Sequence, residues 1–217
     1  MNQFKLSIVT IAYKNYNELI ETIDSIDSQD EEPFENILVL SGFSNLQKEK
    51  LVSNYSKPFR KFFWDIDSSL FNAMNVGIEK SSGNYLLFLN AGDFFVDRDK
   101  LSLIKNFKIN INSVRSCISF KTYQVYKEIS VIRENQASRF LIFLRREKTL
   151  PPHQGFIAPN IKKIRFNENL RVSADNDWMI RNMNEYGVDY SSDILANFKL
   201  GGQSTYPTLK IIYIKLK

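Results

Sequence analysis

Four apolar runs alternate with segments of helical periodicity in the first half of the chain. Residues 4–12, "FKLSIVTIA", are apolar or β-branched almost throughout, which indicates a strand buried on both faces. Similar short runs follow at residues 35–40, 59–64 and 84–90. Candidate helices lie between successive runs, at residues 15–29, near 45–55 and at 68–83. This alternation predicts an α/β fold with a doubly wound, mostly parallel sheet and helices on both of its faces.

Two of the candidate helices carry recognisable end signals. Asn17 is the expected N-cap of the first, ahead of apolar residues at helical spacing, namely Leu19, Ile20, Ile23 and Ile26. Gly83 is the expected stop of the helix over 68–83, in which one face is formed by Leu70, Met74 and Ile78.

The pattern changes after about residue 110. Residues 113–134 contain two apolar segments that we expect to pair as a hairpin, and "HQGFIAP" (153–159) indicates a further β segment. Residues 173–187 predict a helix that begins with Ser173 as N-cap and has apolar residues at helical spacing, namely Trp178, Met179, Met183 and Tyr186. We expect this second half to be a small antiparallel addition to the same domain.

The net charge and the single cysteine limit the possible class of protein but do not identify a binding partner. The 217 residues include 29 Lys and Arg against 24 Asp and Glu, a net charge of +5, and part of that excess lies in the tail "TLKIIYIKLK" (208–217). Such charge suits nucleic acid, anionic lipid or a phosphorylated small molecule alike. The single cysteine, Cys117, excludes an intrachain disulfide and is expected to be buried in a strand.

We find neither a secretory signal pattern at the start of the chain nor an apolar window long enough to span a bilayer. We therefore expect a cytoplasmic protein, with contact to a membrane surface left open.

Polar side chains follow each of the four predicted strands, where ligands of open α/β sheets bind. They include Thr10 and Tyr13, Ser41 and Ser44, Asp65 and Asp67, and Asn90 and Asp93. The first strand is not followed by GxGxxG, and GxxxxGK[ST] occurs nowhere, so dinucleotide and P-loop sites are disfavoured. Asp93 and its neighbours offer oxygen ligands of the kind that Mg²⁺ and Mn²⁺ prefer.

Several blocks together resemble family 2 glycosyltransferases of the GT-A fold, of the bacterial exopolysaccharide and O-antigen type. They are "LSIVTIAYKNYNELIETIDSI", "DIDSSLFNAMNVGIEKSSGNYLLFLNAGDFF", "HQGF", "SADNDWMIR" and "GGQS", spread over residues 6–205. The resemblance implies that a sugar passes from a nucleotide-diphosphate donor to a hydroxyl of a polysaccharide or lipid-linked glycan, with inversion at the anomeric carbon. Nucleic acid is not an expected partner.

The resemblance also implies a single GT-A domain that spans residues 1–217, in which different segments have different functions. Residues 1–110 would form the nucleotide-sugar-binding half, residues 111–205 would bind the acceptor and supply the catalytic base, and residues 206–217 would form a basic amphipathic tail. That tail suits an interfacial helix at the inner face of the cytoplasmic membrane or a packing helix equally well.

The segment "LNAGD" (89–93) occupies the region where acids of the family hold a divalent cation against the donor diphosphate. Asn90 replaces the first acid and Gly92 the middle one, which leaves Asp93 as the metal-binding carboxylate. We therefore expect Mn²⁺ or Mg²⁺ to bind weakly until the donor phosphates complete the site.

The same resemblance assigns residues to the donor and the acceptor. Ser41 stands where an acid contacts the nucleotide base in relatives, and the nucleotide pocket would also include Thr10, Tyr13, Asp67, Asn72, Asn75 and Asn90. His153, the only histidine, and Gln154 are candidates for contact with donor or acceptor, although a lone histidine in "PPHQGF" is also compatible with a purely structural role.

Asp175 lies at the catalytic-base position in "SADNDW", and Asp177 is the competing candidate two residues later. A weakly acidic hydroxyl must lose its proton as it attacks the sugar, so a carboxylate base is required near the acceptor. The positive end of a helix dipole would help to keep such a carboxylate ionised.

Two alternatives to a glycosyltransferase are considered. Ser41, Asn72, Asn90 and Gly92 depart from the family pattern, which favours a non-catalytic protein that binds a sugar nucleotide or a partner enzyme. Retention of Asp93 and Asp175 favours an enzyme instead. A nucleotidyltransferase would need a glycine- and lysine-rich loop after the first strand, and "AYKNYN" does not provide one.

Overall fold

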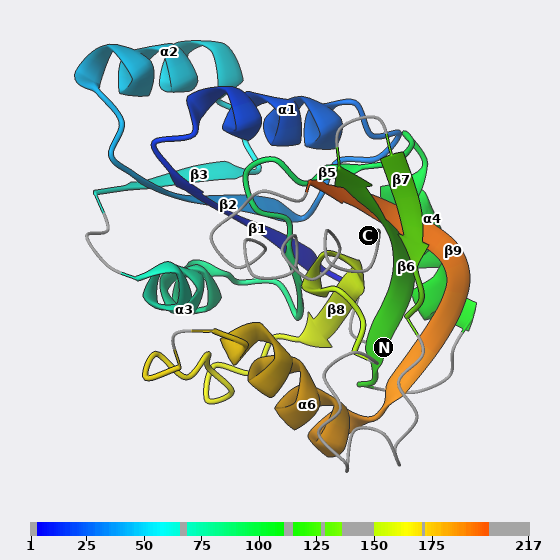
Figure 1. Ribbon diagram of the computed structural model, residues 1–217. Helices are drawn as coiled ribbons and strands as arrows, with labels where there is room; N and C mark the ends of the chain where they lie inside the picture. The colour runs from blue at the N-terminus through cyan, green and yellow to red at the C-terminus, as the bar shows by residue number, and fades with distance from the viewer. Residues whose placement is uncertain are drawn as a thin grey trace, which may run out of the picture.

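The structure, a computed structural model (Figure 1), describes residues 4–65, 69–110, 115–126, 129–135, 150–170 and 172–199. One sheet of nine strands runs through this part of the chain, in the order β3-β2-β1-β4-β8-β6-β9-β5, and β7 pairs with β6 at its side.

The first four strands form the parallel part of the sheet. They are β1 (Leu6–Tyr13), β2 (Glu35–Ser41), β3 (Arg60–Trp64) and β4 (Tyr85–Phe88). Helices α1 (Tyr16–Asp27) and α2 (Asn45–Tyr55) cover one face, and α3 (Leu70–Lys80) lies on the other, as Figure 1 shows. Alternate strand residues point to the two faces, so β1 sends Ala12 toward α1 but Val9 and Ile11 toward α3.

The elements after β4 add mostly antiparallel pairs to this frame. The first half ends with β5 (Phe94–Phe95) and α4 (Lys100–Asn110). The second half contains β6 (Cys117–Tyr126), β7 (Ile129–Arg133), the 3₁₀ helix η2 (His153–Gly155), β8 (Phe156–Pro159), α6 (Ala174–Tyr186) and β9 (Val188–Lys199). β8 is antiparallel to both β4 and β6, β9 is parallel to β6, and β5 is antiparallel to β9. The predicted α/β architecture and the hairpin of β6 and β7 are confirmed.

Both predicted helix signals need correction. Asn17 lies inside α1, and the N-cap is Asn15, whose side-chain oxygen accepts a hydrogen bond from Tyr13 N (2.9 Å). Helix α3 ends at Lys80 rather than at Gly83. A Cβ at Gly83 would come 2.6 Å from the carbonyl oxygen of Lys5, so this glycine permits a close backbone approach instead of ending a helix.

The remaining expectations concern Leu70, Cys117, membrane-spanning helices and two segments near the C-terminus. Leu70 is 41% exposed, so it does not share the buried face of Met74 and Ile78. Cys117 is fully buried in β6, as expected, and burial raises the pKa of its thiol to about 12. Across the described residues we find no helix with the length and apolar character needed to cross a bilayer. The segments 201–204 and 206–217 lie outside the described residues.

Candidate active site

A tight turn at residues 90–93 follows the carboxyl end of β4. Beyond β4, Leu89 N and Ala91 N still donate to backbone oxygens of β1, so the chain stays beside the central strand until the turn begins. Asp93 N donates to Asn90 O (2.9 Å), and Gly92 has φ +96°, a left-handed conformation that suits glycine. The turn is therefore fixed by the centre of the sheet.

Asp93 projects from this turn into the protein rather than into solvent. Its residue is only 7% exposed, and Gln154 Nε2 of η2 donates to Asp93 Oδ2 (3.1 Å). Burial raises the pKa of Asp93 to about 6, against the opposing effects of the nearby His153 and the Gln154 hydrogen bond. A carboxylate that is costly to ionise in this way gains from a neighbouring cation.

His153 connects the turn to the start of α6. Its Nε2 lies 3.3 Å from Asn90 Nδ2, and its Nδ1 lies 3.4 Å from Asp175 Oδ2. Burial lowers the pKa of His153, but the Asp175 carboxylate and the charge of Asp93 outweigh that effect, so the pKa is raised overall. Burial raises the pKa of Asp175, but the hydrogen bond and charge of His153 outweigh it and the pKa is lowered.

Five predicted site residues thus come together from three separate parts of the sequence. We call them the acid–histidine cluster: Asn90, Asp93, His153, Gln154 and Asp175. The antiparallel insertion of β8 beside β4 brings η2 to the turn at residues 90–93, and α6 then places its first turn against η2.

The start of α6 separates the two candidate bases. Ser173 occupies the predicted N-cap position, but with φ +64° and without a side-chain capping bond. Asp175 joins the cluster, whereas Asp177 binds Arg181 through Nε (3.0 Å) and a terminal nitrogen (2.8 Å). Two residues correspond to a rotation of about 200° around a helix, so these two carboxylates leave α6 in nearly opposite directions.

The residues predicted for the nucleotide pocket are more dispersed. Tyr13 and Ser41 lie side by side in register at the carboxyl ends of β1 and β2, and Tyr13 is 60% exposed. Thr10 lies three residues deeper in β1 and is fully buried, and its hydroxyl has no hydrogen-bond partner in the described part of the chain. Asp67 lies outside the described residues.

Asn72 and Asn75 lie on α3 and face the segment that leads to α6, not the cluster. Asn72 Nδ2 donates to Glu168 (2.9 Å), and Asn75 Nδ2 donates to the same carboxylate (2.7 Å). Asn75 also exchanges two hydrogen bonds with the backbone of Phe166. These contacts attach α3 to residues 166–168.

The donor set of the cluster fits a divalent cation only in part. Within the described ranges, no three His, Cys, Asp or Glu side chains gather as a metal-binding group. Asp93 offers a carboxylate, and the side-chain oxygen of Asn90 is buried without a hydrogen-bond partner among the described residues. Both are hard oxygen donors that suit Mg²⁺ or Mn²⁺, and further ligands would have to come from a bound substrate.

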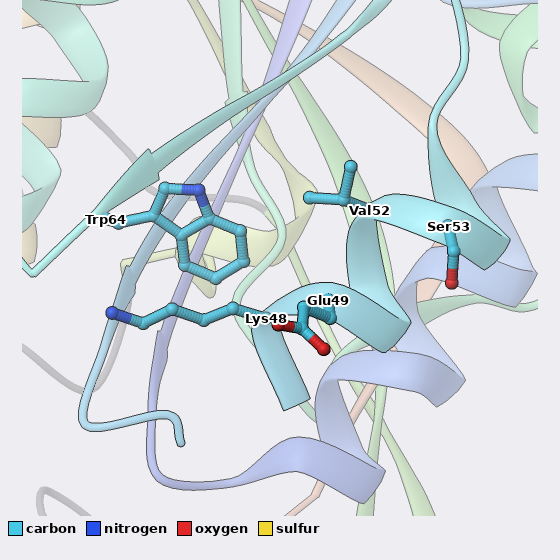
Figure 2. A pocket seen from close by; sticks show the side chains of 5 residues that line it. All are labelled: Lys48, Glu49, Val52, Ser53 and Trp64. Carbon is cyan, nitrogen blue, oxygen red and sulfur yellow. The ribbon is translucent and has the colours of Figure 1, made fainter. Parts of the chain in front are cut away.

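Two cavities lie outside the cluster, and neither is lined by any of its residues. A shallow groove of about 390 Å³ lies between α2 and the end of β3 and is lined by Lys48, Glu49, Val52, Ser53 and Trp64 (Figure 2). In this groove Lys48 extends past the indole of Trp64 and pairs with Asp65 (2.5 Å). A polar cleft of about 550 Å³ lies between the start of α4 and strands β6, β7 and β9.

One buried contact of the turn was not predicted from the sequence. Thr22, on the inner face of α1, accepts a hydrogen bond from Gly92 N (2.9 Å). The available signal was a hydroxyl within an otherwise apolar stripe, formed by Leu19, Ile23 and Ile26.

Comparison with known proteins identifies the family of the chain. Residues 7–169 match the family model described as glycosyl transferase family 2. The "Uncharacterized glycosyltransferase MJ1057" of Methanocaldococcus jannaschii is 24% identical over 214 residues, which cover 92% of this chain and 73% of that protein. An "Uncharacterized glycosyltransferase" of Rickettsia bellii is 32% identical over 118 residues, 54% of this chain and 17% of that protein.

Solved structures of S. aureus TarS share the fold. The fragment 1–349 in complex with UDP superposes with a TM-score of 0.68 at 17% identity, covering 98% of this chain and 65% of that one. The same fragment in complex with UDP-GlcNAc gives a TM-score of 0.67 at 17% identity, with 93% and 60% covered. In a further TarS structure the match spans 40% of that chain, so this chain corresponds to only part of TarS.

Proposed function

Because the chain belongs to glycosyl transferase family 2, we propose that it transfers a sugar from a nucleotide-diphosphate donor to a hydroxyl of a polysaccharide or lipid-linked glycan. The observation that carries the proposal is the acid–histidine cluster, in which His153 lies between Asn90 and Asp175 while its neighbour Gln154 bonds Asp93. Asp93 would hold a cation against the leaving diphosphate, and Asp175 would accept the proton of the attacking hydroxyl. Transfer with inversion needs these two functions on opposite sides of the sugar.

Asp175 is the proposed general base. The hydrogen bond from His153 lowers the pKa of Asp175, so the carboxylate is ionised at neutral pH and ready to accept the proton of the acceptor hydroxyl. His153 would orient this carboxylate, much as a second residue orients the base in other acid–base pairs. Asp177, in contrast, is already engaged by Arg181.

Asp93 and the side-chain oxygen of Asn90 are the proposed protein ligands of Mg²⁺ or Mn²⁺. When bound, the cation would neutralise charge on the departing diphosphate. Two protein oxygens make an incomplete coordination shell, which favours binding only together with the donor phosphates.

The parallel half is the proposed nucleotide-sugar site, and the remainder is the proposed acceptor site. Tyr13 and Ser41 at the ends of β1 and β2 would contact the nucleotide, together with Asp67. Thr10 and Asn75 are buried, whereas Asn72 bonds the exposed Glu168, and we propose that these three residues shape the pocket from behind. The acceptor of the exopolysaccharide or O-antigen type and action at the cytoplasmic face of a membrane are part of the same proposal.

The proposal is tested first with a panel of nucleotide sugars and Mn²⁺ or Mg²⁺, starting with UDP-GlcNAc because TarS was solved with it. We expect protection against thermal unfolding and slow release of nucleotide diphosphate with at least one donor. No protection and no release with any donor would contradict the proposal.

The base assignment is tested by Asp175→Asn, with Asp177→Asn as the matched control on the same helix. Loss of a general base is expected to reduce transfer by about 10²–10⁴-fold while donor binding stays nearly unchanged. Asp177→Asn should keep most of the activity because that carboxylate faces Arg181. Full turnover by the Asp175 variant would remove Asp175 from the mechanism.

A second candidate function is binding of a sugar nucleotide without catalysis. The incomplete metal-binding set, with Asn90 and Gly92 in place of acids, favours this alternative. Donor binding without any diphosphate release, in both the parent protein and the Asp175 variant, would support it.

A further inference from the structure

We propose that Thr22 of α1 is a positioning residue for the turn at residues 90–93, and that its hydroxyl fixes the place where Asp93 and Asn90 meet a cation. The inference rests on the proposed function for its consequence, but the positioning itself is a property of the chain alone. Thr22 lies 68 residues before Asn90 in the sequence and belongs to a different element.

The hydroxyl of Thr22 contacts the turn at two points. It accepts a hydrogen bond from Gly92 N (2.9 Å), and its hydrogen lies within reach of Asn90 O (3.2 Å). Thr22 is completely buried, so water does not compete for these contacts. The hydroxyl oxygen therefore holds the third residue of the turn from the side of α1, and its single hydrogen has Asn90 O and Glu18 O as alternative acceptors.

The turn is held from two sides in this way. Gln154 binds the Asp93 side chain from η2, whereas Thr22 binds the backbone of the turn from α1. Between them lies Gly92, which has a left-handed backbone (φ +96°) and whose N–H donates both to Thr22 Oγ1 (2.9 Å) and, over a longer distance, to Glu18 O (3.1 Å). Loss of the hydroxyl would loosen the backbone that presents both proposed metal ligands.

The Thr22 hydroxyl could also serve only its own helix. Threonine in a helix often donates to the carbonyl four residues earlier, and Thr22 Oγ1 does lie 3.1 Å from Glu18 O. That contact needs only the hydrogen of the hydroxyl. The bond from Gly92 N uses its oxygen and serves another element, and the position is otherwise flanked by apolar Leu19, Ile23 and Ile26. A valine would satisfy the packing equally well, so the hydroxyl is explained by the turn.

Thr22→Val removes the hydroxyl at nearly constant shape, Thr22→Ser restores it, and Thr122→Val is the matched control. Thr122 is equally buried, but its hydroxyl has no hydrogen-bond partner among the described residues. The first measurement is amide hydrogen exchange of residues 89–95 without any ligand. Thr22→Val leaves Gly92 N with only its longer bond to Glu18 O (3.1 Å), so we expect Gly92 to exchange faster by up to about tenfold, with a rate close to the parent's in Thr22→Ser and Thr122→Val.

The second measurement is Mn²⁺ affinity in the presence of UDP, followed by electron paramagnetic resonance of free Mn²⁺. We expect affinity to fall about tenfold in Thr22→Val and to recover in Thr22→Ser. If Thr22 only stabilised the fold, Thr22→Val would lower the melting temperature, but neither the exchange of residues 89–95 nor the Mn²⁺ affinity would change more than in Thr122→Val.

Unchanged exchange of residues 89–95 in Thr22→Val, or equal changes in Thr122→Val, would overturn the proposal. Thr22→Ala serves in the same comparison if Thr22→Val does not fold, because it removes the hydroxyl without adding a methyl group. If the parent protein fails to bind Mn²⁺ with UDP, the proposed function loses its metal site, but hydrogen exchange still decides the role of Thr22.

Discussion

Glu35 is a buried carboxylate at the amino ends of the parallel strands, far along the sheet from the acid–histidine cluster. It is 2% exposed and accepts hydrogen bonds from Ser7 Oγ (2.6 Å), Lys61 Nζ (2.7 Å), the backbone and side chain of Ser82, and Gly83 N (3.0 Å). A single residue thereby joins the first three strands to the turn between α3 and β4.

We expect Glu35→Gln to change how stability depends on pH. Burial raises the pKa of Glu35, but the bonds from Lys61, Ser7 and Ser82 outweigh it and lower the pKa to about 2. A lowered pKa in the folded state means that the stabilisation is present above the unfolded pKa of about 4.3 and is lost as pH falls toward 2.

Urea unfolding of both proteins at pH 7, 4 and 3 measures this effect. At pH 7 we expect the variant to be less stable by about 2 kcal/mol, with the gap closing as the pH falls. A gap of the same size at pH 7 and pH 3 would exclude ionisation of Glu35 as its cause.

Some residues of the candidate site and of the buried polar contacts were predictable from sequence patterns, and others were not, for a physical reason. Asn90 and Asp93 were predictable because they follow an apolar strand, where ligand-binding residues of α/β sheets lie. Thr22 and Glu35 were not, because the partners of Glu35 and the turn bound by Thr22 lie 26 to 70 residues away, and no local periodicity records such contacts. Contact between His153 and Asp175 likewise depends on how η2 and α6 pack.

At the scale of elements, α3 is attached to the segment before α6 by one buried side chain. Asn75, which is 2% exposed, donates to Phe166 O (3.0 Å) and accepts from Phe166 N (2.7 Å). Because Trp178 of α6 donates to Ile164 O and stacks on Phe166, this segment also determines where α6 lies.

Asn75→Ala is expected to lower the free energy of unfolding by about 2–4 kcal/mol, since two buried backbone groups of Phe166 lose their partners. Asn72→Ala is the control, because within the described residues the Asn72 side chain bonds only the exposed Glu168 carboxylate, so its loss should cost less than about 1 kcal/mol. Chemical denaturation measures both values. Equal losses would show that attachment through the Phe166 backbone is not what stabilises this region.

Helices and strands with a strong period were predictable as elements, but their ends and the shortest strands were not. Strand β9 contains the polar sequence "VDYSSD", and its pairing with β6 is interrupted by register shifts, so alternation is weak. β5 has only two residues and exists through its pairing with β9. Tertiary pairing rather than local propensity creates both strands.

At the scale of the whole molecule, the two halves share the largest cluster of buried residues and the candidate active site. The largest cluster of buried residues combines Val9 of β1 and Met74 of α3 with Phe156 of β8 and Trp178 of α6. Asn90 and Asp93 come from the parallel half, whereas His153, Gln154 and Asp175 come from the other. The division at residue 110 therefore predicts which half of the chain binds the nucleotide sugar and which binds the acceptor. It does not predict that either half folds by itself.

A fragment of residues 1–110 is accordingly expected not to fold cooperatively. It would keep β1 to β4 with their helices, but it would lose β8, which pairs along one edge of β4, and β9, which pairs with β5. The face formed by Val9, Met74 and Phe88 would also lose its packing against α6. Exposed apolar surface and a free edge of a central strand favour aggregation over a stable fold.

Urea unfolding followed by tryptophan fluorescence and near-ultraviolet circular dichroism compares this fragment with the full chain. We expect a broad, non-cooperative transition for the fragment, and a sharper one when a separate fragment of residues 111–217 is added, since β8 and α6 then restore the missing contacts. A cooperative transition of the isolated fragment would mean that the parallel half carries its own core. In that case the acid–histidine cluster would be a contact between two independently stable units, and mutations at Phe156 or Trp178 should leave the stability of the parallel half unchanged.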